Sequence, residues 1–264
     1  MTKDNLDTVR DQFTRQAVGF SQSPEMRDEA ALQLLVAASG VKSGARVLDI
    51  ACGPGLVVCA FAEVGAHAAG IDATPAMIER AKDLAKSKGL LNVEWHVGVV
   101  APLPFADHGF DVVTCRFAFH HFPSPIDAFA EMNRVCKPDG MILVCDAYTS
   151  DDPAKAEAFN KMERLRDPST VRFLRLDELE GIFRRANLQP VRQFYRVPFE
   201  VNTLMKASFP NEGDATHVRE MIVQSAADDA LGVNARRVGD QVIFDYSAVI
   251  LVAQKHPGGQ VFPG

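Results

Sequence analysis

One acidic residue and two glycines lie close together around residue 50, and a second acid ends the next predicted strand, in an order that suits cofactor binding. The apolar run 47–50 contains Asp49, and the turn that follows it contains Gly53 and Gly55. A strand, a tight glycine turn and a helix begin a nucleotide-binding α/β unit, because glycine lets the backbone approach a ligand closely. Asp72 ends the next predicted strand, where a carboxylate can accept hydrogen bonds from both ribose hydroxyls. The spacing predicts a site for an adenosine-containing cofactor.

The residue at position 58 separates two classes of cofactor. Dinucleotide folds use a third glycine there, so that the helix packs closely and its N-terminus meets the pyrophosphate, but this chain has Val58. S-adenosyl-L-methionine has no pyrophosphate and does not need that glycine. Asp49 can also order the glycine loop and lie near the ammonium group of a bound amino acid. The pattern therefore favours S-adenosylmethionine.

A second set of candidates follows the fourth predicted strand, at residues 116–122. The carboxyl ends of strands in an open α/β sheet face the ligand crevice, so Arg116 and Phe117 should lie beside the cofactor. His120 or His121 can act as a general base, or one can orient a loop while the other packs beside adenosine. Adjacent residues of a strand point to opposite faces, so we expect only one histidine to face the substrate, with His121 the nearer to the cofactor.

Asp146 ends the fifth predicted strand and is the acid expected nearest to the two histidines. It is a second candidate base, or an organiser of the loop that follows it. A metal site on the histidine pair would need more carboxylate or nitrogen ligands, so we expect no metal.

Substrate recognition is predicted for aromatic and basic residues outside the glycine turn. Four arginines, including Arg166 and Arg172, follow the fifth strand, and arginine binds carboxylates bidentately. Alternatively, these arginines form a solvated face that pairs with neighbouring acids. Phe119 is expected to wall an apolar acceptor pocket. Phe13 and Phe20, in the N-terminal segment, are expected to close over the cofactor.

Alternating strands and helices indicate the fold class. Strands are predicted at residues 46–51, 68–71, 93–97, 110–115, 141–146, 191–201 and 242–254, and helices at 27–39, 57–64, 75–88, 125–135, 153–165 and 176–187. This order predicts an α/β fold with a doubly wound, mostly parallel sheet of seven strands. The last two strands surround an insertion, which predicts an antiparallel hairpin at one edge of the sheet.

The same pattern predicts a single domain over residues 1–255. Residues 1–40 form an N-terminal helical cap, residues 41–147 the cofactor-binding core, and residues 148–190 and 202–240 a helical lid over the substrate. Residues 256–264, rich in glycine and proline, are expected to be loosely ordered.

Composition excludes several functions. The chain has 264 residues, a net charge of -6 and a pI near 5.7, so no basic face for nucleic acid is expected. No apolar run is long enough to span a membrane, and the polar N-terminus does not resemble a signal peptide. Five cysteines without a CxxC pair indicate reduced, buried thiols and a cytoplasmic location. The expected partner is a small-molecule substrate. The sequence leaves open whether the chain forms a homodimer.

These motifs together resemble the class I S-adenosylmethionine-dependent methyltransferases. The chain is most similar to the type 11 group, which includes the C-methyltransferases of ubiquinone and menaquinone biosynthesis. The resemblance rests on residues 47–55, 70–74, 103–105, 110–113, 134–135 and 137–140, in the order and spacing of the family. It implies a Rossmann-like methyltransferase fold and S-adenosyl-L-methionine as the cofactor.

The resemblance also implies roles for single residues. The cofactor set that it implies, joined to the candidates above, is Phe20, Asp49, Ala51, Gly53, Gly55, Asp72, Ala73, Met77, Val99, Val100, Arg116, Phe117 and His121. Ala51 and both glycines would line the methionine part, Asp72 would hold the ribose, and Ala73 and Met77 would flank the adenine. The family usually has Gly-Asp-Ala where this chain has residues 98–100 without an acid, so we expect weaker cofactor binding.

The predicted function is methyl transfer to an oxygen or carbon of a small molecule. A second hypothesis keeps the cofactor but uses its positive charge in a rearrangement or elimination, which leaves the product mass unchanged. A third is a non-catalytic binding module, which the missing acid at Val99 slightly favours. A dinucleotide-dependent oxidoreductase is the weakest alternative, because of Val58.

Overall fold

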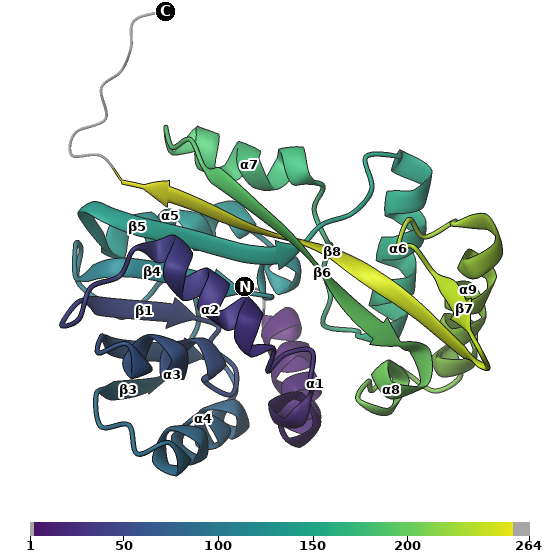
Figure 1. Ribbon diagram of the computed structural model, residues 1–264, viewed down its shortest axis with the longest axis horizontal. Coiled ribbons are helices and arrows are strands. Elements are labelled where there is room, and N and C mark those ends of the chain that lie inside the picture. Colours follow the sequence, from purple (N-terminus) through teal and green to yellow (C-terminus); the bar gives the residue numbers. More distant parts are fainter. Residues whose placement is uncertain (1–2, 256–264) are drawn as a thin grey trace, which may run out of the picture.

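One mixed sheet forms the centre of the molecule. The structure is a computed structural model that describes residues 3–255. Its strands run in the order β3-β2-β1-β4-β5-β8-β6, and the short β7 pairs with β8 (Figure 1). The strands are β1 (Arg46–Ile50), β2 (His67–Asp72), β3 (Val93–Val97), β4 (Phe110–Arg116), β5 (Cys136–Ala147), β6 (Val191–Glu200), β7 (Arg236–Val238) and β8 (Gln241–Gln254). The first five strands pair in parallel, and β8 is antiparallel to its neighbours. The predicted sheet and its antiparallel edge are confirmed.

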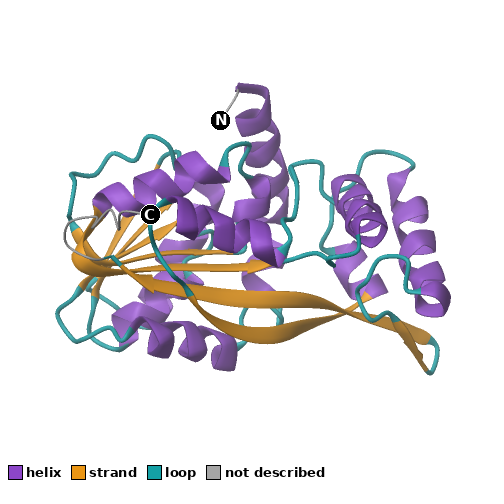
Figure 2. Ribbon diagram, turned by 90° about the horizontal axis from the view of Figure 1, so that it is seen from above, coloured by secondary structure: helices purple, strands orange, loops and turns teal. Residues whose placement is uncertain are grey.

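Helices cover both faces of this sheet (Figure 2). They are α1 (Lys3–Gln22), α2 (Glu29–Ser39), α3 (Leu56–Glu63), α4 (Pro75–Ser87), α5 (Pro125–Val135), α6 (Pro153–Arg166), α7 (Leu176–Arg185), α8 (Val201–Lys206) and α9 (Asp214–Asp228), with a 3-10 turn η1 (Phe119–His121). Proline occupies the first turn of α4, α5 and α6, where its missing N–H leaves no hydrogen bond unmade. No helix within residues 3–255 has the length and apolar character needed to cross a membrane.

Alternation along the strands divides the core into two layers. In β1, Val47 packs with α2 and α3 on one face, while Leu48 packs with α5 and α7 on the other. Successive side chains of a strand point to opposite faces, so a strand that is buried on both sides must be apolar throughout. The long strands β6 and β8 extend beyond the parallel region and carry a second group of helices, α6, α8 and α9 (Figure 1).

Three local features differ from the sequence prediction. The insertion between the last two long strands is helical, as predicted, but it also contains the short strand β7, which the pattern did not predict. The sequence Lys-Pro-Asp-Gly at residues 137–140 is typical of a turn, but it lies inside β5 as a bulge, because Cys136 pairs with Phe110 and Met141 pairs with Val112. The two histidines lie in η1, not in a strand. The predicted tail, residues 256–264, lies outside the described residues.

Candidate active site

A cavity of about 820 Å³ opens at the carboxyl ends of β1, β2 and β4, beneath α1. Twelve of the thirteen residues predicted for the cofactor line it: Phe20, Asp49, Ala51, Gly53, Asp72, Ala73, Met77, Val99, Val100, Arg116, Phe117 and His121. Phe13, predicted for the substrate, also lines this cavity.

Gly55 is the exception and lies outside the cavity wall. It precedes α3 with a φ of 80°, and a Cβ at this position would lie 2.6 Å from the Trp95 ring. Real Cβ atoms do not approach other atoms so closely. Glycine is therefore required at position 55 for two reasons. The backbone has a positive φ where the chain enters α3, and the Trp95 ring leaves no space for a side chain.

Asp72 orders the glycine turn from the end of β2. Its Oδ2 accepts a hydrogen bond from the Gly53 backbone N–H at 2.9 Å, and its Oδ1 accepts one from Thr74 at 2.8 Å. Burial raises the pKa of Asp72, against the effect of these two hydrogen bonds. The sequence prediction gave the ordering of the loop to Asp49, but the hydrogen bond to the turn comes from Asp72.

Asp49 and Arg116 bring two buried opposite charges to the same cavity. Within residues 3–255, Asp49 Oδ1 has no hydrogen-bond partner, and neither do Arg116 Nε and Nη2, while Arg116 Nη1 donates to the Met26 carbonyl at 3.1 Å. Burial raises the pKa of Asp49 well above its usual range, and Arg116 opposes this shift. Buried polar atoms are costly when unpaired. A zwitterionic amino-acid group, such as the methionine end of S-adenosylmethionine, would satisfy both side chains.

The opposite end of the cavity is apolar. Val100 and Met77 are buried there, and Ala73 and Val99 complete the wall. These apolar side chains would pack against the faces of a flat aromatic ring such as adenine.

A second cavity, of about 760 Å³, adjoins the first. Both are lined by Phe13, Phe20, Met26, Phe117 and His121, so these residues stand where the two cavities meet. Its remaining walls come from α1, η1, the end of α6, β6, α8 and β8. The two cavities thus adjoin through these five residues.

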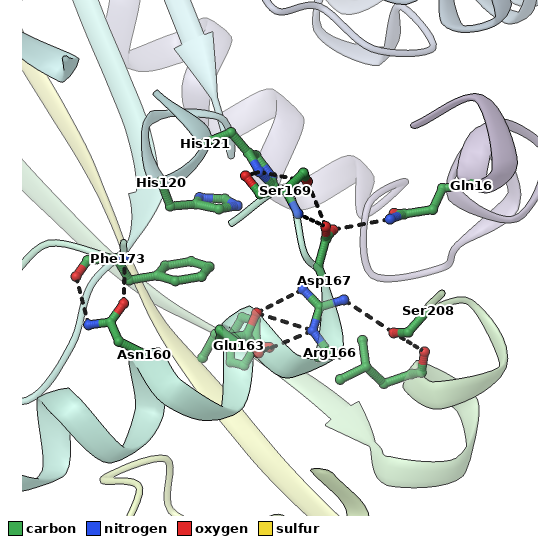
Figure 3. A network of polar contacts seen from close by, with 12 residues as sticks. Gln16, His120, His121, Asn160, Glu163, Arg166, Asp167, Ser169, Phe173 and Ser208 are labelled. Carbon is green, nitrogen blue, oxygen red and sulfur yellow. Dashed lines mark hydrogen bonds and ion pairs between the residues drawn. The ribbon is translucent and has the colours of Figure 1, made fainter. Parts of the chain in front are cut away.

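His120 and Asp146 form a buried pair at the second cavity. The Nδ1 of His120 lies 2.9 and 3.1 Å from the two carboxylate oxygens of Asp146. The same carboxylate accepts hydrogen bonds from the backbone N–H groups of His120 and Ala147, which fixes its orientation. The imidazole stacks on Phe173, with ring centroids 4.0 Å apart (Figure 3). Within the described residues, Nε2 has no hydrogen-bond partner.

His121 lies beside it, and its ring centroid is 4.2 Å from that of His120. Its Nδ1 lies 3.1 Å from both the carbonyl oxygen and the hydroxyl of Ser169 (Figure 3). Burial, together with the neighbouring His120, lowers the pKa of His121 to about 4. Both histidines line the second cavity. The expectation that only one would face the substrate side is wrong, because η1 does not alternate its side chains as a strand does.

Arg166 lines the second cavity but is already paired within the chain. Its Nε and Nη2 bond the carboxylate of Glu163 at 2.8–3.2 Å, and its Nη1 donates to the Ser208 hydroxyl at 3.2 Å (Figure 3). Glu163 is fully buried and also accepts a hydrogen bond from Tyr246. The positive charge of Arg166 is thus balanced before any ligand enters.

Two predicted substrate residues lie away from both cavities. Phe119 is 2% exposed and packs against Phe122 in the core on the α5 side of the sheet. Arg172 is half-exposed and forms an ion pair with Glu178. Three of the four arginines form ion pairs with acids at the surface, as the alternative of a solvated face predicts; they are Arg164, Arg172 and Arg175. Of the four, only Arg166 lines one of the two cavities.

The sequence pattern missed several residues of the second cavity. Gln16, Asp167, Phe173 and Tyr246 come from four different segments, which only the fold brings together. Of these, Asp167 directly follows Arg166 and lies two residues before Ser169, and this short polar stretch was the available signal.

Comparisons with known proteins agree with this geometry. The sequence model of a family described as "Methyltransferase domain" matches residues 48–144. The uncharacterized methyltransferase YcgJ of Bacillus subtilis is 33% identical over 245 residues, which cover 88% of this chain and 96% of that protein. A demethylmenaquinone methyltransferase of Staphylococcus haemolyticus is 40% identical over 122 residues, which are 45% of this chain and 50% of the relative.

Solved structures extend the likeness to the whole fold. The crystal structure of YcgJ has a TM-score of 0.80 at 30% identity and covers 87% of this chain and 99% of that chain. A putative methyltransferase, BH2331 from Bacillus halodurans, has a TM-score of 0.79 at 24% identity and shares the fold over 86% of this chain and 100% of its own. The chain belongs to the S-adenosylmethionine-dependent methyltransferases. Its cofactor is S-adenosyl-L-methionine.

Proposed function

We propose that this methyltransferase methylates an oxygen or carbon atom of a small molecule bound in the second cavity. The observation that carries the proposal is the buried His120–Asp146 pair beside a cavity that shares five residues with the cofactor cavity. Helix α1 contributes to the walls of both cavities and covers them on one side. A macromolecular acceptor would need an open surface at this point.

The cofactor supplies a methyl group on a positively charged sulfur, which becomes a neutral thioether when the methyl group leaves. Arg116 would hold its carboxylate, and Asp49 its ammonium group. Asp72 would accept hydrogen bonds from the ribose, while Ala73, Met77, Val99 and Val100 would pack around the adenine. Holding two reactants in line contributes as much as ~7–11 kcal/mol of barrier lowering in favourable cases.

His120 acts as the general base in this proposal. Asp146 accepts the Nδ1 proton of His120, which leaves the lone pair of Nε2 available for the acceptor. When the acceptor oxygen or carbon forms its bond to the methyl group, Nε2 takes the proton that the acceptor loses. Asp146 is a positioning residue that also stabilises the imidazolium. His121, with its pKa near 4, is a weaker base and serves as part of the wall between the cavities.

The test is transfer of a labelled methyl group from S-adenosylmethionine into a small-molecule extract, followed by mass spectrometry of the product. The expected product is heavier by one methylene, and an unchanged mass would instead indicate a rearrangement. With the acceptor identified, His120→Gln should lower kcat by about 10²–10⁴ and leave the affinity for S-adenosylhomocysteine unchanged. Asp146→Asn should flatten the pH profile of kcat. His217→Gln, on the exposed face of α9, is the control. Full activity of His120→Gln would contradict the role of the base.

A further inference from the structure

The second cavity has an unbalanced negative charge in its wall. Asp167 is 3% exposed, and its Oδ1 accepts hydrogen bonds from the backbone N–H of Ser169 at 2.9 Å and from the Ser169 hydroxyl at 2.6 Å. Its Oδ2 accepts one from the Gln16 side chain at 3.1 Å (Figure 3). Although burial favours the protonated form, the charges of His121 and Arg166, together with these hydrogen bonds, hold the pKa of Asp167 at about 2. The carboxylate is therefore ionised at neutral pH.

The cations near Asp167 do not cancel this charge. Arg166 is bound to the fully buried Glu163, so one positive charge faces two carboxylates. His121 is neutral at pH 7 because its pKa is near 4. Asp146 adds a further acid behind His120. Within residues 3–255, no lysine and no second arginine lines this cavity.

Aromatic rings form much of the remaining wall. They come from Phe13, Phe20, Phe117, Phe173, Phe199 and Tyr246. The face of an aromatic ring attracts cations, by roughly 0.5–2 kcal/mol for each well-placed pair. A carboxylate that enters such a cavity loses its hydration and meets like charges, whereas an ammonium group meets opposite charges.

We propose that the acceptor cavity selects an amine-bearing, cationic aromatic or apolar compound over an acidic one, and that Asp167 is the residue that determines this preference. The proposal rests on the proposed function, because it takes the second cavity as the acceptor site. It reverses the sequence expectation that arginines here bind a carboxylate. The ammonium group contributes to recognition, and the methylated atom is a separate part of the same molecule.

The test compares three ligands of similar size, 2-phenylethylamine, 2-phenylethanol and phenylacetate, on the protein saturated with S-adenosylhomocysteine. This cofactor product has no sulfonium, so its charge does not enter the comparison. Calorimetry should give the tightest binding for the amine and the weakest for the carboxylate, with roughly tenfold between them. Asp167→Asn should reduce that ratio several-fold, and Asp177→Asn, an exposed acid on α7, should leave it unchanged.

The ranking in the wild-type protein decides the proposal even when Asp167→Asn does not fold. Equal binding of the three ligands, or tightest binding of phenylacetate, would overturn the charge preference and leave the acceptor cavity in place. Binding of none of the three would overturn both the preference and the assignment of the cavity. An unchanged ratio in a folded Asp167→Asn protein would remove Asp167 from its role.

Discussion

Acidification should destabilise the protein through His121. In the unfolded chain this imidazole titrates near its ordinary pKa of 6.5, and in the folded protein burial and His120 lower that value to about 4. Between these two values the unfolded state binds more protons than the folded state. The contribution of His121 to the free energy of unfolding therefore rises with pH in this window and is lost as the pH falls through it, whereas Asp49 and Asp72, whose pKa values burial raises, act in the opposite direction.

The size of the effect follows from the two pKa values. A shift from 6.5 to about 4, at 1.36 kcal/mol for each pKa unit, limits the contribution of His121 to about 3 kcal/mol. From about pH 7.5 to about pH 4.5, roughly 2.5 kcal/mol of this should be lost. Asp167 contributes little in this range, because its pKa of about 2 lies below it.

Urea unfolding across this pH range measures the effect. His121→Gln, which does not titrate, should lose the corresponding part of the pH dependence, whatever its stability at neutral pH. His217→Gln, at an exposed position on α9, should keep the wild-type slope. An NMR titration of the wild-type protein gives the His121 pKa directly. A measured value near 6.5, or equal slopes in wild-type and His121→Gln proteins, would refute the reasoning.

Three further predictions concern other parts of the chain. Val99→Asp adds a charged acceptor at the adenine end of the cavity and should tighten S-adenosylhomocysteine binding roughly tenfold in calorimetry. Gly55→Ala should lower the free energy of unfolding by about 2–4 kcal/mol, from positive φ and from the clash with the neighbouring ring. Gly89→Ala, which shares the positive φ but meets open space, should cost only about 1 kcal/mol. Glu163→Gln breaks a buried ion pair and should cost about 3–5 kcal/mol. Glu157→Gln, in an exposed pair, should cost less than about 1 kcal/mol.

Each of these predictions has an outcome that contradicts it. Weaker or unchanged cofactor binding in Val99→Asp would count against the adenine assignment. Equal costs for Gly55→Ala and Gly89→Ala would show that the close approach to Trp95 does not matter. A small cost for Glu163→Gln would mean that Arg166 keeps its place without its partner, and that its charge is free for a ligand.

Most predicted residues of the first cavity were accessible to sequence reasoning because they belong to short motifs at the ends of neighbouring strands. Asp49 lies in β1, Gly53 follows it and Asp72 ends β2; the two strands are adjacent in the sheet, so the spacing of these residues fixes their separation in space. Their hydrogen-bonding roles were less accessible. Whether Asp49 or Asp72 binds the glycine turn depends on the direction of each side chain. In the structure, Asp72 accepts the hydrogen bond from the Gly53 backbone N–H.

The second cavity shows where sequence reasoning stops. Phe119 and Arg172 have suitable residue types, yet one is buried in the core and the other pairs with an acid at the surface. Whether an arginine is free for a ligand depends on its partners. Arg166 has the fully buried Glu163 as its partner, which the sequence alone does not reveal.

The sequence by itself determined the fold class and the cofactor, and it predicted twelve of the residues that line the first cavity. Fold class and cofactor follow from periodic apolar patterns and from short motifs, both of which are local properties of the chain. Only the tertiary structure decided the character of the second cavity. Gln16, His120, Asp167 and Tyr246 are far apart in sequence, and their contacts set the burial, pairing and charge of that site. Burial, pairing and charge depend on which side chains lie next to one another, and these distant residues come into contact only in the folded chain.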